Sequence, residues 1–395
     1  MAETVAGRSY LFGVSSFYDN QGSVYAVPTA AVTGRPYEFL AQLGLDNAPP
    51  APGHLGRATI AYSLELPSFG RIPRRLSVRV RDKSLAVLRP DFRQQGKAMG
   101  FIDEWHTPMG PAEASFGFIA ATEFIVPAAG RTLTEYLSPG QWQTTGVDLY
   151  GTAPNAAWIE QTPTGTYRAG NTYRDVWGSA ALGVASATTR LGNVITPDIL
   201  PDSASAPGYL DADYIFGGIS GTITLRRGAT VVGTGPIVNQ PQFRVPAGRA
   251  RYTLTATQRR SVPWSTLGTR ARATWTFRSG HVAGDNPAVL PLWDVRISGA
   301  FSNLDRAPAG RPFRLTVAPD LPAGAPRARI TSIAVRASFD NGRTWRRLVL
   351  RRAGPGRWIT TVTPPRASAF VSLSASLTDA AGISARQTVI RAYQL

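Results

Sequence analysis

The sequence predicts an all-β fold made of consecutive β-sandwich domains, and three observations indicate it. Apolar and polar residues alternate along short runs such as Ala58–Leu66, Arg270–Arg278 and Phe313–Ala318, as expected for half-buried strands. Glycine (39 residues) and proline (31 residues) are spread along the whole chain, where they divide it into many short strands joined by turns. Helical periodicity is almost absent.

Two hairpins are visible in the sequence. In Thr222–Gly233, two β-rich runs flank Arg227-Gly228-Ala229, where Gly228 can supply the positive φ of a tight turn. Near the end of the chain, the runs Val371–Leu377 and Arg386–Tyr393 flank a turn with Asp and Gly in favourable positions.

Two changes in composition suggest domain boundaries, at Pro127–Gly130 and at Gly284–Pro287. We therefore expect three domains. Residues 1–130 are β-rich and leave their architecture open. Residues 131–285 form a β-sandwich, for which a jelly roll is one candidate. Residues 286–395 have the length and strand spacing of an immunoglobulin-like or fibronectin-like sandwich.

Charge and cysteine content restrict the function classes. The chain of 395 residues has no cysteine, which excludes disulfides, cysteine-based zinc sites and a thiol nucleophile. The net charge is +17, and residues 286–395 hold 16 basic against 5 acidic residues. Only Lys83 and Lys97 are lysine, a bias typical of a GC-rich genome. A polyanionic partner is the alternative interpretation.

The sequence predicts a protein without a membrane span. No apolar run approaches the roughly 20 residues that a spanning helix needs. The first residues lack the basic and apolar regions of a signal peptide. If the chain belongs to a secreted protein, we expect its export signal to lie outside this sequence.

No catalytic site is predicted. The three histidines, His54, His106 and His281, are expected in surface loops, and none has the spacing of a helical zinc site. Gly218–Thr222 comes nearest to a nucleophile elbow but leads into a strand. Asp103-Glu104 is either a polar loop or half of a glycosidase carboxylate pair.

Four aspartates form the one metal-site candidate. Clustered carboxylates on a loop rich in Pro, Ser and Gly can hold calcium, which takes six to eight oxygen ligands. The spacing is not that of an EF-hand, and an ordinary solvated loop is the alternative. The candidates are Asp198, Asp202, Asp211 and Asp213.

The segment Ser338–Trp345 matches the Asp-box pattern S-x-D-x-G-x-T-W. We expect a structural turn in which Asp340 accepts hydrogen bonds, Gly342 is left-handed and Trp345 packs beneath the hairpin. One copy argues against a propeller. The run Trp345–Arg352 carries four arginines, which suits an edge strand or, alternatively, a polyanion groove using Trp345 and Trp358.

Roughly the last 270 residues resemble the C-terminal region of large secreted subtilases from high-GC Gram-positive bacteria. Each segment is unspecific alone, but their order and the ending of the chain are more specific. Residues 1–130 fit less clearly, through Asp19–Gly22 and Val80–Asp82. The matching segments are Tyr167–Gly170, Val176-Trp177, Gly221–Gly228, Val231–Gly233, Val245–Ala247, Tyr252–Leu254, Thr274–Ser279, Leu290–Leu292, Val295-Arg296, Ser338–Trp345, Val371–Leu373, Thr378–Gly382 and Arg391–Leu395.

The family's Asp, His and Ser catalytic motifs are all missing from this sequence, so the resemblance carries over no catalytic residue. It implies a secreted, extracellular and non-catalytic appendage that stabilises or spaces a subtilase catalytic domain, in cis or in trans, or tethers its substrate. A cell-wall or polysaccharide polymer is a further expected partner, and nucleic acid is not expected.

Two alternatives from other classes stay open. One is a stand-alone carbohydrate- or cell-wall-binding β-sandwich protein that uses exposed aromatic residues such as Trp105, Trp142 and Trp177. The other is a glycosidase. Apart from the calcium candidates, no cofactor is predicted.

Overall fold

The computed structural model describes residues 12–14, 22–27, 37–46, 58–68, 80–95, 101–109, 121–124, 133–150, 155–206, 210–212 and 218–395. These residues contain strands and short 3-10 turns such as Asp82–Ser84 and Ile237–Asn239, with no α-helix among them. The all-β prediction is confirmed. No helix in these ranges is long and apolar enough to cross a membrane.

The chain divides into two compact units. Unit 1 contains residues 1–92, 99–156 and 161–176, and unit 2 contains residues 93–98, 157–160 and 177–395. In chain order, the strands up to residue 177 are β1 (Phe12–Val14), β2 (Gly22–Val27), β3 (Tyr37–Asp46), β4 (Ala58–Ser68), β5 (Ala86–Leu88), β6 (Asp91–Phe92), β7 (Phe101–Pro108), β8 (Ala121–Phe124), β9 (Thr134–Leu137), β10 (Gly140–Tyr150), β11 (Asn155–Gln161), β12 (Gly165–Tyr167), β13 (Thr172–Tyr173) and β14 (Val176–Trp177).

Unit 1 is built from two sheets. One has the strand order β1-β2-β3-β4-β9-β5-β13, and in the other β10 pairs with both β7 and β12. Their buried side chains meet, since Leu88 and Leu137 of the first sheet share a cluster with Trp142 and Tyr167 of the second. Burying apolar area of this kind is the main favourable term in folding.

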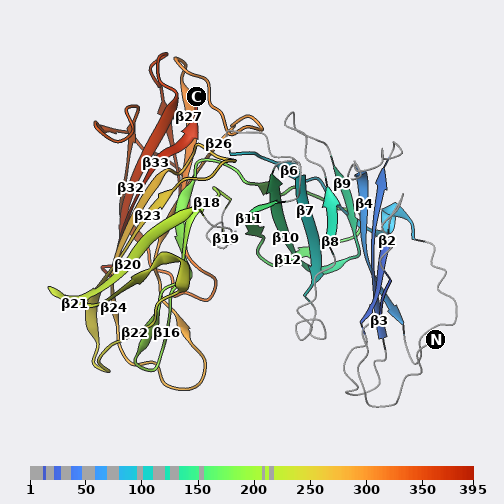
Figure 1. The fold of residues 1–395 in the computed structure, drawn as a ribbon, viewed down its shortest axis with the longest axis horizontal. Coiled ribbons are helices and arrows are strands. Elements are labelled where there is room, and N and C mark those ends of the chain that lie inside the picture. The colour runs from blue at the N-terminus through green and yellow to red at the C-terminus, as the bar shows by residue number, and fades with distance from the viewer. Residues whose placement is uncertain are drawn as a thin grey trace. The chain divides into compact units, whose positions relative to one another are not determined.

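Unit 2 contains the remaining strands (Figure 1), and one of its sheets has eight strands. They are β15 (Gly183–Ser186), β16 (Thr189–Leu191), β17 (Val194–Thr196), β18 (Ile199–Ser203), β19 (Leu210–Ala212), β20 (Ile219–Arg227), β21 (Thr230–Pro236), β22 (Phe243–Arg244), β23 (Ala250–Arg260), β24 (Arg270–Ser279), β25 (Ala288–Val289), β26 (Asp294–Gly299), β27 (Phe313–Asp320), β28 (Ile330–Ser338), β29 (Arg346–Arg347), β30 (Arg351–Gly354), β31 (Arg357–Val362), β32 (Phe370–Asp379) and β33 (Ser384–Gln394).

The eight-stranded sheet has the order β21-β20-β23-β24-β33-β32-β28-β29. One face is apolar and buried, with Leu225, Leu254, Trp275 and Leu377 all at most 2% exposed. The four-stranded sheet β26-β27-β31-β30 covers part of this face. The buried Gln387 of β33 exchanges two hydrogen bonds with the backbone of Val295 in β26. Unit 2 thus contains a β-sandwich, as the sequence predicts.

Strands on both sides of the expected boundary at residue 285 belong to the same sheet. Arg270–Thr276 of β24 pairs with Ser384–Ile390 of β33. The borders at residues 130 and 285 stay predictions, and so does the immunoglobulin-like subtype. A strand before residue 285, β24, is nevertheless hydrogen-bonded to a strand after it, β33.

Asp379 ties the last hairpin to the core. Its Oδ1 accepts hydrogen bonds from the backbone N–H groups of Ala381 and Ile383, each at 2.9 Å. Its Oδ2 accepts the indole N–H of Trp293 at 2.8 Å. The side chain is 3% exposed, so removing it leaves buried donors without their acceptor.

We expect Asp379→Ala to lower the free energy of unfolding by about 3 kcal/mol, because unsatisfied buried donors cost about 1–3 kcal/mol each. Urea denaturation followed by tryptophan fluorescence measures it. Asp285→Ala, in an exposed loop, is the control and should change stability by less than about 0.5 kcal/mol. Equal effects of the two substitutions would contradict the assigned role of Asp379.

Candidate anion-binding groove

The outer face of the eight-stranded sheet carries threonine, serine and arginine. Side chains alternate along a strand, so when one face of the sheet is buried, every second residue lies on the opposite, outer face. The pairing aligns these outward residues into rows that cross the sheet. The central row is Thr222, Thr257, Arg272, Thr388, Ser374, Arg336 and Arg347.

Hydroxyl groups within these rows bond to one another across the strands. Ser374 and Thr388 lie 2.9 Å apart, and Thr222 and Thr257 lie 3.0 Å apart, measured between hydroxyl oxygens. Such cross-strand pairs stabilise a sheet and hold the side chains in defined rotamers. The outer face is therefore an ordered hydroxyl surface.

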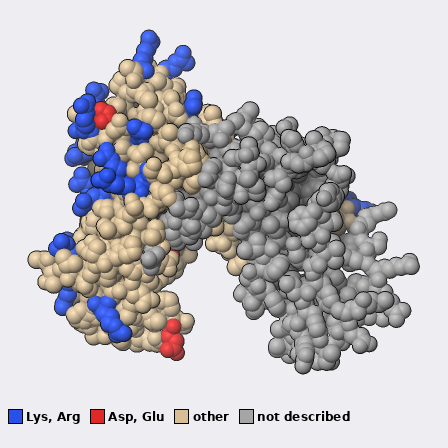
Figure 2. Space-filling model, in the orientation of Figure 1, with Lys and Arg blue, Asp and Glu red and all other residues tan. Residues whose placement is uncertain are grey.

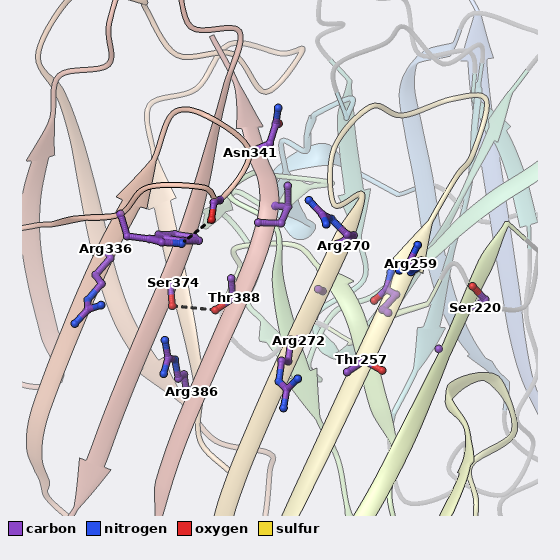
Figure 3. Close-up of a pocket in the computed structure, with 16 residues that line it drawn as sticks. Ser220, Thr257, Arg259, Arg270, Arg272, Arg336, Asn341, Ser374, Arg386 and Thr388 are labelled. Atoms are coloured by element: carbon purple, nitrogen blue, oxygen red, sulfur yellow. Dashed lines mark hydrogen bonds between the residues drawn. The ribbon is translucent and has the colours of Figure 1, made fainter.

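A groove of about 630 Å³ crosses this face. Five arginines line it and are all exposed: Arg259, Arg270, Arg272, Arg336 and Arg386. Figure 3 shows Arg259, Arg270 and Arg272 on neighbouring strands beside the hydrogen-bonded pair Ser374 and Thr388. Figure 2 shows that basic side chains far outnumber acidic ones on the visible described surface.

These arginines are not neutralised within the described part of the chain. No carboxylate there lies within ion-pair distance of any of the five guanidinium groups. Arg259 is also directly opposite Arg270, and Arg336 is directly opposite Arg347. Like charges facing each other across strands are destabilising. A bound anion would relieve this repulsion.

The Asp-box segment forms one wall of the groove, to which Asn341, Gly342 and Trp345 belong. Asp340 accepts hydrogen bonds from the backbone N–H and the hydroxyl of Thr344, at 2.9 and 2.6 Å. Gly342 has φ +88°, a conformation that residues with a side chain rarely adopt, and a Cβ here would approach Ile390 Cδ1 to 2.6 Å. The turn therefore requires glycine at this position.

Trp345 is held by the same turn. Its indole N–H donates to the carbonyl oxygen of Gly342 at 3.0 Å, and its side chain is half-buried. Asn341, the neighbouring residue, accepts a hydrogen bond from Arg391 of β33 at 3.0 Å. The structure thus brings Ser338, Asp340, Gly342 and Trp345 together, and the indole lines the groove in a fixed orientation.

The run Trp345–Arg352 is not the single strand that its sequence suggests. Arg346–Arg347 forms β29 in the eight-stranded sheet, whereas Arg351–Gly354 forms β30 in the four-stranded sheet. A strand that passes between two layers must leave one ladder before it joins the next. Trp358 lies on β31 of the four-stranded sheet and does not line the groove.

The aromatic residues expected to bind carbohydrate are placed differently. Trp142 and Trp177 are 0% and 2% exposed, so the prediction that they are exposed is wrong. Both indoles serve as core instead, as large aromatic side chains usually do. The side chain of Trp105 lies outside the described residues, and so do the side chains of Asp103 and Glu104.

The calcium candidates are only partly described. Asp198 accepts a hydrogen bond from Gln240, while burial raises the pKa of its carboxyl. The buried Asp202 receives a short hydrogen bond from Gln258 and lies 3.6 Å from Arg260. The side chain of Asp211 and all of Asp213 are outside the described ranges. Within those ranges no group of three or more His, Asp and Glu side chains could hold a metal.

The histidines include one unexpected cluster. His106 is 2% exposed rather than in a surface loop, so that expectation is wrong. Its Nδ1 lies 2.8 Å from the hydroxyl of Thr144, and its Nε2 lies 2.8 Å from a carboxylate oxygen of Glu135. His281 is exposed, as expected, and its Nδ1 lies 3.0 Å from Oδ1 of Asn193. His54 lies outside the described residues.

The His106 cluster joins a hydroxyl, an imidazole and a carboxylate in the order of a catalytic triad. Thr144 is 0% exposed and Glu135 is 1% exposed, so no substrate reaches the hydroxyl in this conformation. The cluster links β7 and β10 of one sheet to β9 of the other. It is a buried polar network, and such networks help to specify a unique core.

Comparisons with known proteins leave the family of this chain open. No protein-family model matches the sequence. No curated protein matches it. Among solved structures, the ectodomain of human desmocollin-1 aligns with 90% of this chain at 10% identity and a TM-score of 0.16. The chain spans 64% of that ectodomain's length. A similarity of this size carries no argument about fold or function.

The hydrogen bonds to Asp340 hold the pKa of its carboxyl well below the ordinary value of 3.8, the Thr344 hydroxyl contributing most. A lowered folded-state pKa stabilises the turn above the unfolded pKa, and this stabilisation is lost as pH falls through the folded pKa. We therefore expect the Asp340 carboxyl to titrate with a midpoint well below 3.8, in an NMR titration of the side-chain carboxyl carbon.

Thr344→Val should raise this titration midpoint towards 3.8, because it removes the largest of the hydrogen bonds that stabilise the ionised form. Thr331→Val is the control, since the Thr331 hydroxyl bonds to the carbonyl oxygen of Thr378 and not to the turn. An Asp340 midpoint at the ordinary value in the parent protein would refute the assigned hydrogen bonding.

Proposed function

We propose that this chain is a non-catalytic, extracellular binding appendage of a subtilisin-like serine peptidase, and that its groove holds an acidic polymer. The subtilase partner rests on the sequence resemblance of the C-terminal region. The binding role rests on one observation, the groove lined by five exposed arginines that have no carboxylate partner among the described residues. An appendage of this kind would keep polymeric material close to an attached or associated catalytic domain.

The arrangement of charge supports a polymer more than a small anion. The groove crosses six neighbouring strands, from β20 to β28, and strands lie about 4.8 Å apart. The five arginines lie on strands from β23 to β28, four strand spacings apart, and are therefore distributed over roughly 19 Å. Exposed guanidinium groups each contribute modestly, about 0.2–1 kcal/mol per ion pair. Useful affinity requires a ligand that meets several of them at once.

The alternative of a stand-alone polymer-binding protein uses the same groove. It differs only in whether a catalytic domain accompanies the chain. A subtilase domain encoded in frame with this chain, or a peptidase that co-purifies with it, supports the appendage. No observation on the described residues favours the glycosidase alternative.

We expect the protein to bind polygalacturonate and polyphosphate but not neutral dextran, as measured by calorimetry. Binding should weaken steeply between about 0.1 M and about 1 M salt, as the screening length falls from about 10 Å to about 3 Å. The double substitution Arg270→Ser with Arg272→Ser should weaken binding about tenfold, since two surface ion pairs contribute up to about 2 kcal/mol.

The matched control is Arg251→Ser with Arg278→Ser. Arg251 of β23 and Arg278 of β24 are exposed on the same face of the sheet, but outside the groove. They should leave the affinity nearly unchanged. Equal losses from both double variants would mean that general charge, and not the groove, causes binding.

We also expect no peptide hydrolysis by this chain alone. Casein or a fluorogenic peptide incubated with the pure protein should remain intact, because the only hydroxyl–imidazole–carboxylate cluster in the described residues is buried. Cleavage that is lost in Thr144→Val would show that local opening exposes the cluster, and would overturn the non-catalytic assignment. Trp358→Ala, distant in sequence from the cluster, is the control for purity and handling.

A further inference from the structure

The groove combines three chemistries on one rigid surface. Guanidinium groups and hydroxyl groups share the cross-strand rows, and a single indole stands at the wall formed by the Asp-box turn. Each chemistry suits a different part of a ligand. The guanidinium groups pair with carboxylates, the hydroxyl rows exchange hydrogen bonds with other hydroxyls, and the indole offers an apolar face.

We propose that the ligand is an acidic polysaccharide that crosses the strands, with one sugar ring on Trp345 and its carboxylates on the arginines. This inference rests on the proposed function, because it specifies the polymer that the same groove holds. Trp345 is the stacking platform. Arg270, Arg272 and Arg336 are the carboxylate partners.

The floor of the groove favours a polymer rich in hydroxyl groups. In the central row, Thr388 and Ser374 lie between Arg272 and Arg336, and Thr257 lies on the other side of Arg272. Their hydroxyl groups can donate and accept hydrogen bonds. A sugar presents hydroxyl groups at every repeat and so matches such a floor. A polyphosphate presents charge without hydroxyl donors.

The aromatic content argues against single-stranded nucleic acid. Proteins that bind such strands stack successive bases on several aromatic side chains along a basic groove. The described lining of this groove contains Trp345 as its one aromatic residue. A single platform fits a polymer in which most repeats are held by polar contacts.

The spacing of the cations also fits a polysaccharide. Arg272 of β24 and Arg336 of β28 stand in one cross-strand row, three strand spacings apart. A polymer perpendicular to the strands meets a new strand about every 4.8 Å. That interval is close to the length of one sugar ring, so a uronic acid polymer presents about one carboxylate per strand.

The test compares three probes by calorimetry at one salt concentration: an oligogalacturonate of about five sugars, long enough to span the roughly 24 Å of the groove, a polyphosphate and an oligothymidylate of similar charge. We expect the oligogalacturonate to bind at least tenfold more tightly than the other two. Trp345→Ala should weaken oligogalacturonate binding about tenfold and leave polyphosphate binding unchanged.

Trp358→Ala is the matched control, since Trp358 is half-buried on another sheet outside the groove. Trp345→Phe separates stacking from the fold of the turn. It loses the indole hydrogen bond to Gly342, as Trp345→Ala does, but keeps an aromatic face. We expect Trp345→Phe to retain most of the affinity.

Three outcomes would overturn the inference. Equal affinities for oligogalacturonate and polyphosphate, both insensitive to Trp345→Ala, would show that the ligand is not specifically a polysaccharide. The proposed binding of an acidic polymer would still hold. Tightest binding of oligothymidylate would replace the polysaccharide by nucleic acid. Binding of none of the three probes would overturn the inference together with the acidic-polymer function.

Discussion

Burial of one face of the eight-stranded sheet is the constraint on which unit 2 depends. Apolar side chains from β20, β23, β24, β32 and β33 must all point to the same side, which fixes the register of every pair. A slip by one residue would expose Trp275 and Leu254 and bury the arginines. The row that runs from Thr222 to Arg347 is therefore a consequence of core packing.

The same constraint places like charges beside one another. Arg259 and Arg270 must leave their strands on the same face, because the neighbouring residues Gln258 and Ala271 are paired and buried on the other face. In water and salt the resulting repulsion is small and is outweighed by the apolar area that the sheet buries. It nevertheless favours any anion that can bridge these arginines. Fold stability and the proposed ligand preference thus share one physical cause.

Much of the fold is predictable from the sequence, and the groove is only partly so. Alternation in Arg270–Arg278 and Phe313–Ala318 correctly predicts β24 and β27, because the period of two is a local property. The pairing of β24 with β33 joins segments more than 100 residues apart, and no local pattern encodes it. Four of the groove arginines lie on β24, on β33 or on β23, which pairs with β24, so their alignment depends on this long-range pairing. Composition predicts their charge but not their alignment.

The errors have the same origin. Trp142, Trp177 and Trp345 are equally apolar in the sequence, and only tertiary packing decides that the first two are core. His106 follows Asp103, Glu104 and Trp105, and no alternation around it predicts its burial. Its partners Glu135 and Thr144 come from other strands, 29 and 38 residues later in the sequence. The sequence after Trp345 reads as one continuous β-rich run. Nothing in it predicts that β29 joins the eight-stranded sheet and β30 the four-stranded sheet.

The Asp-box turn is ordered mainly by its own hydrogen bonds, and this matters for ligand binding. Its local hydrogen bonds, from Thr344 to Asp340 and from Trp345 to Gly342, are complete without any other part of the chain. Arg391 adds one long-range hydrogen bond, which anchors Asn341 to β33 at the edge of the groove. A turn that is ordered by its own contacts loses little further conformational entropy when a ligand binds. The flexible arginines lose more, since each long side chain gives up rotamer freedom on pairing. A rigid platform beside mobile cations is therefore a physical basis for selecting a ligand by its ring, while charge brings the polymer to the surface.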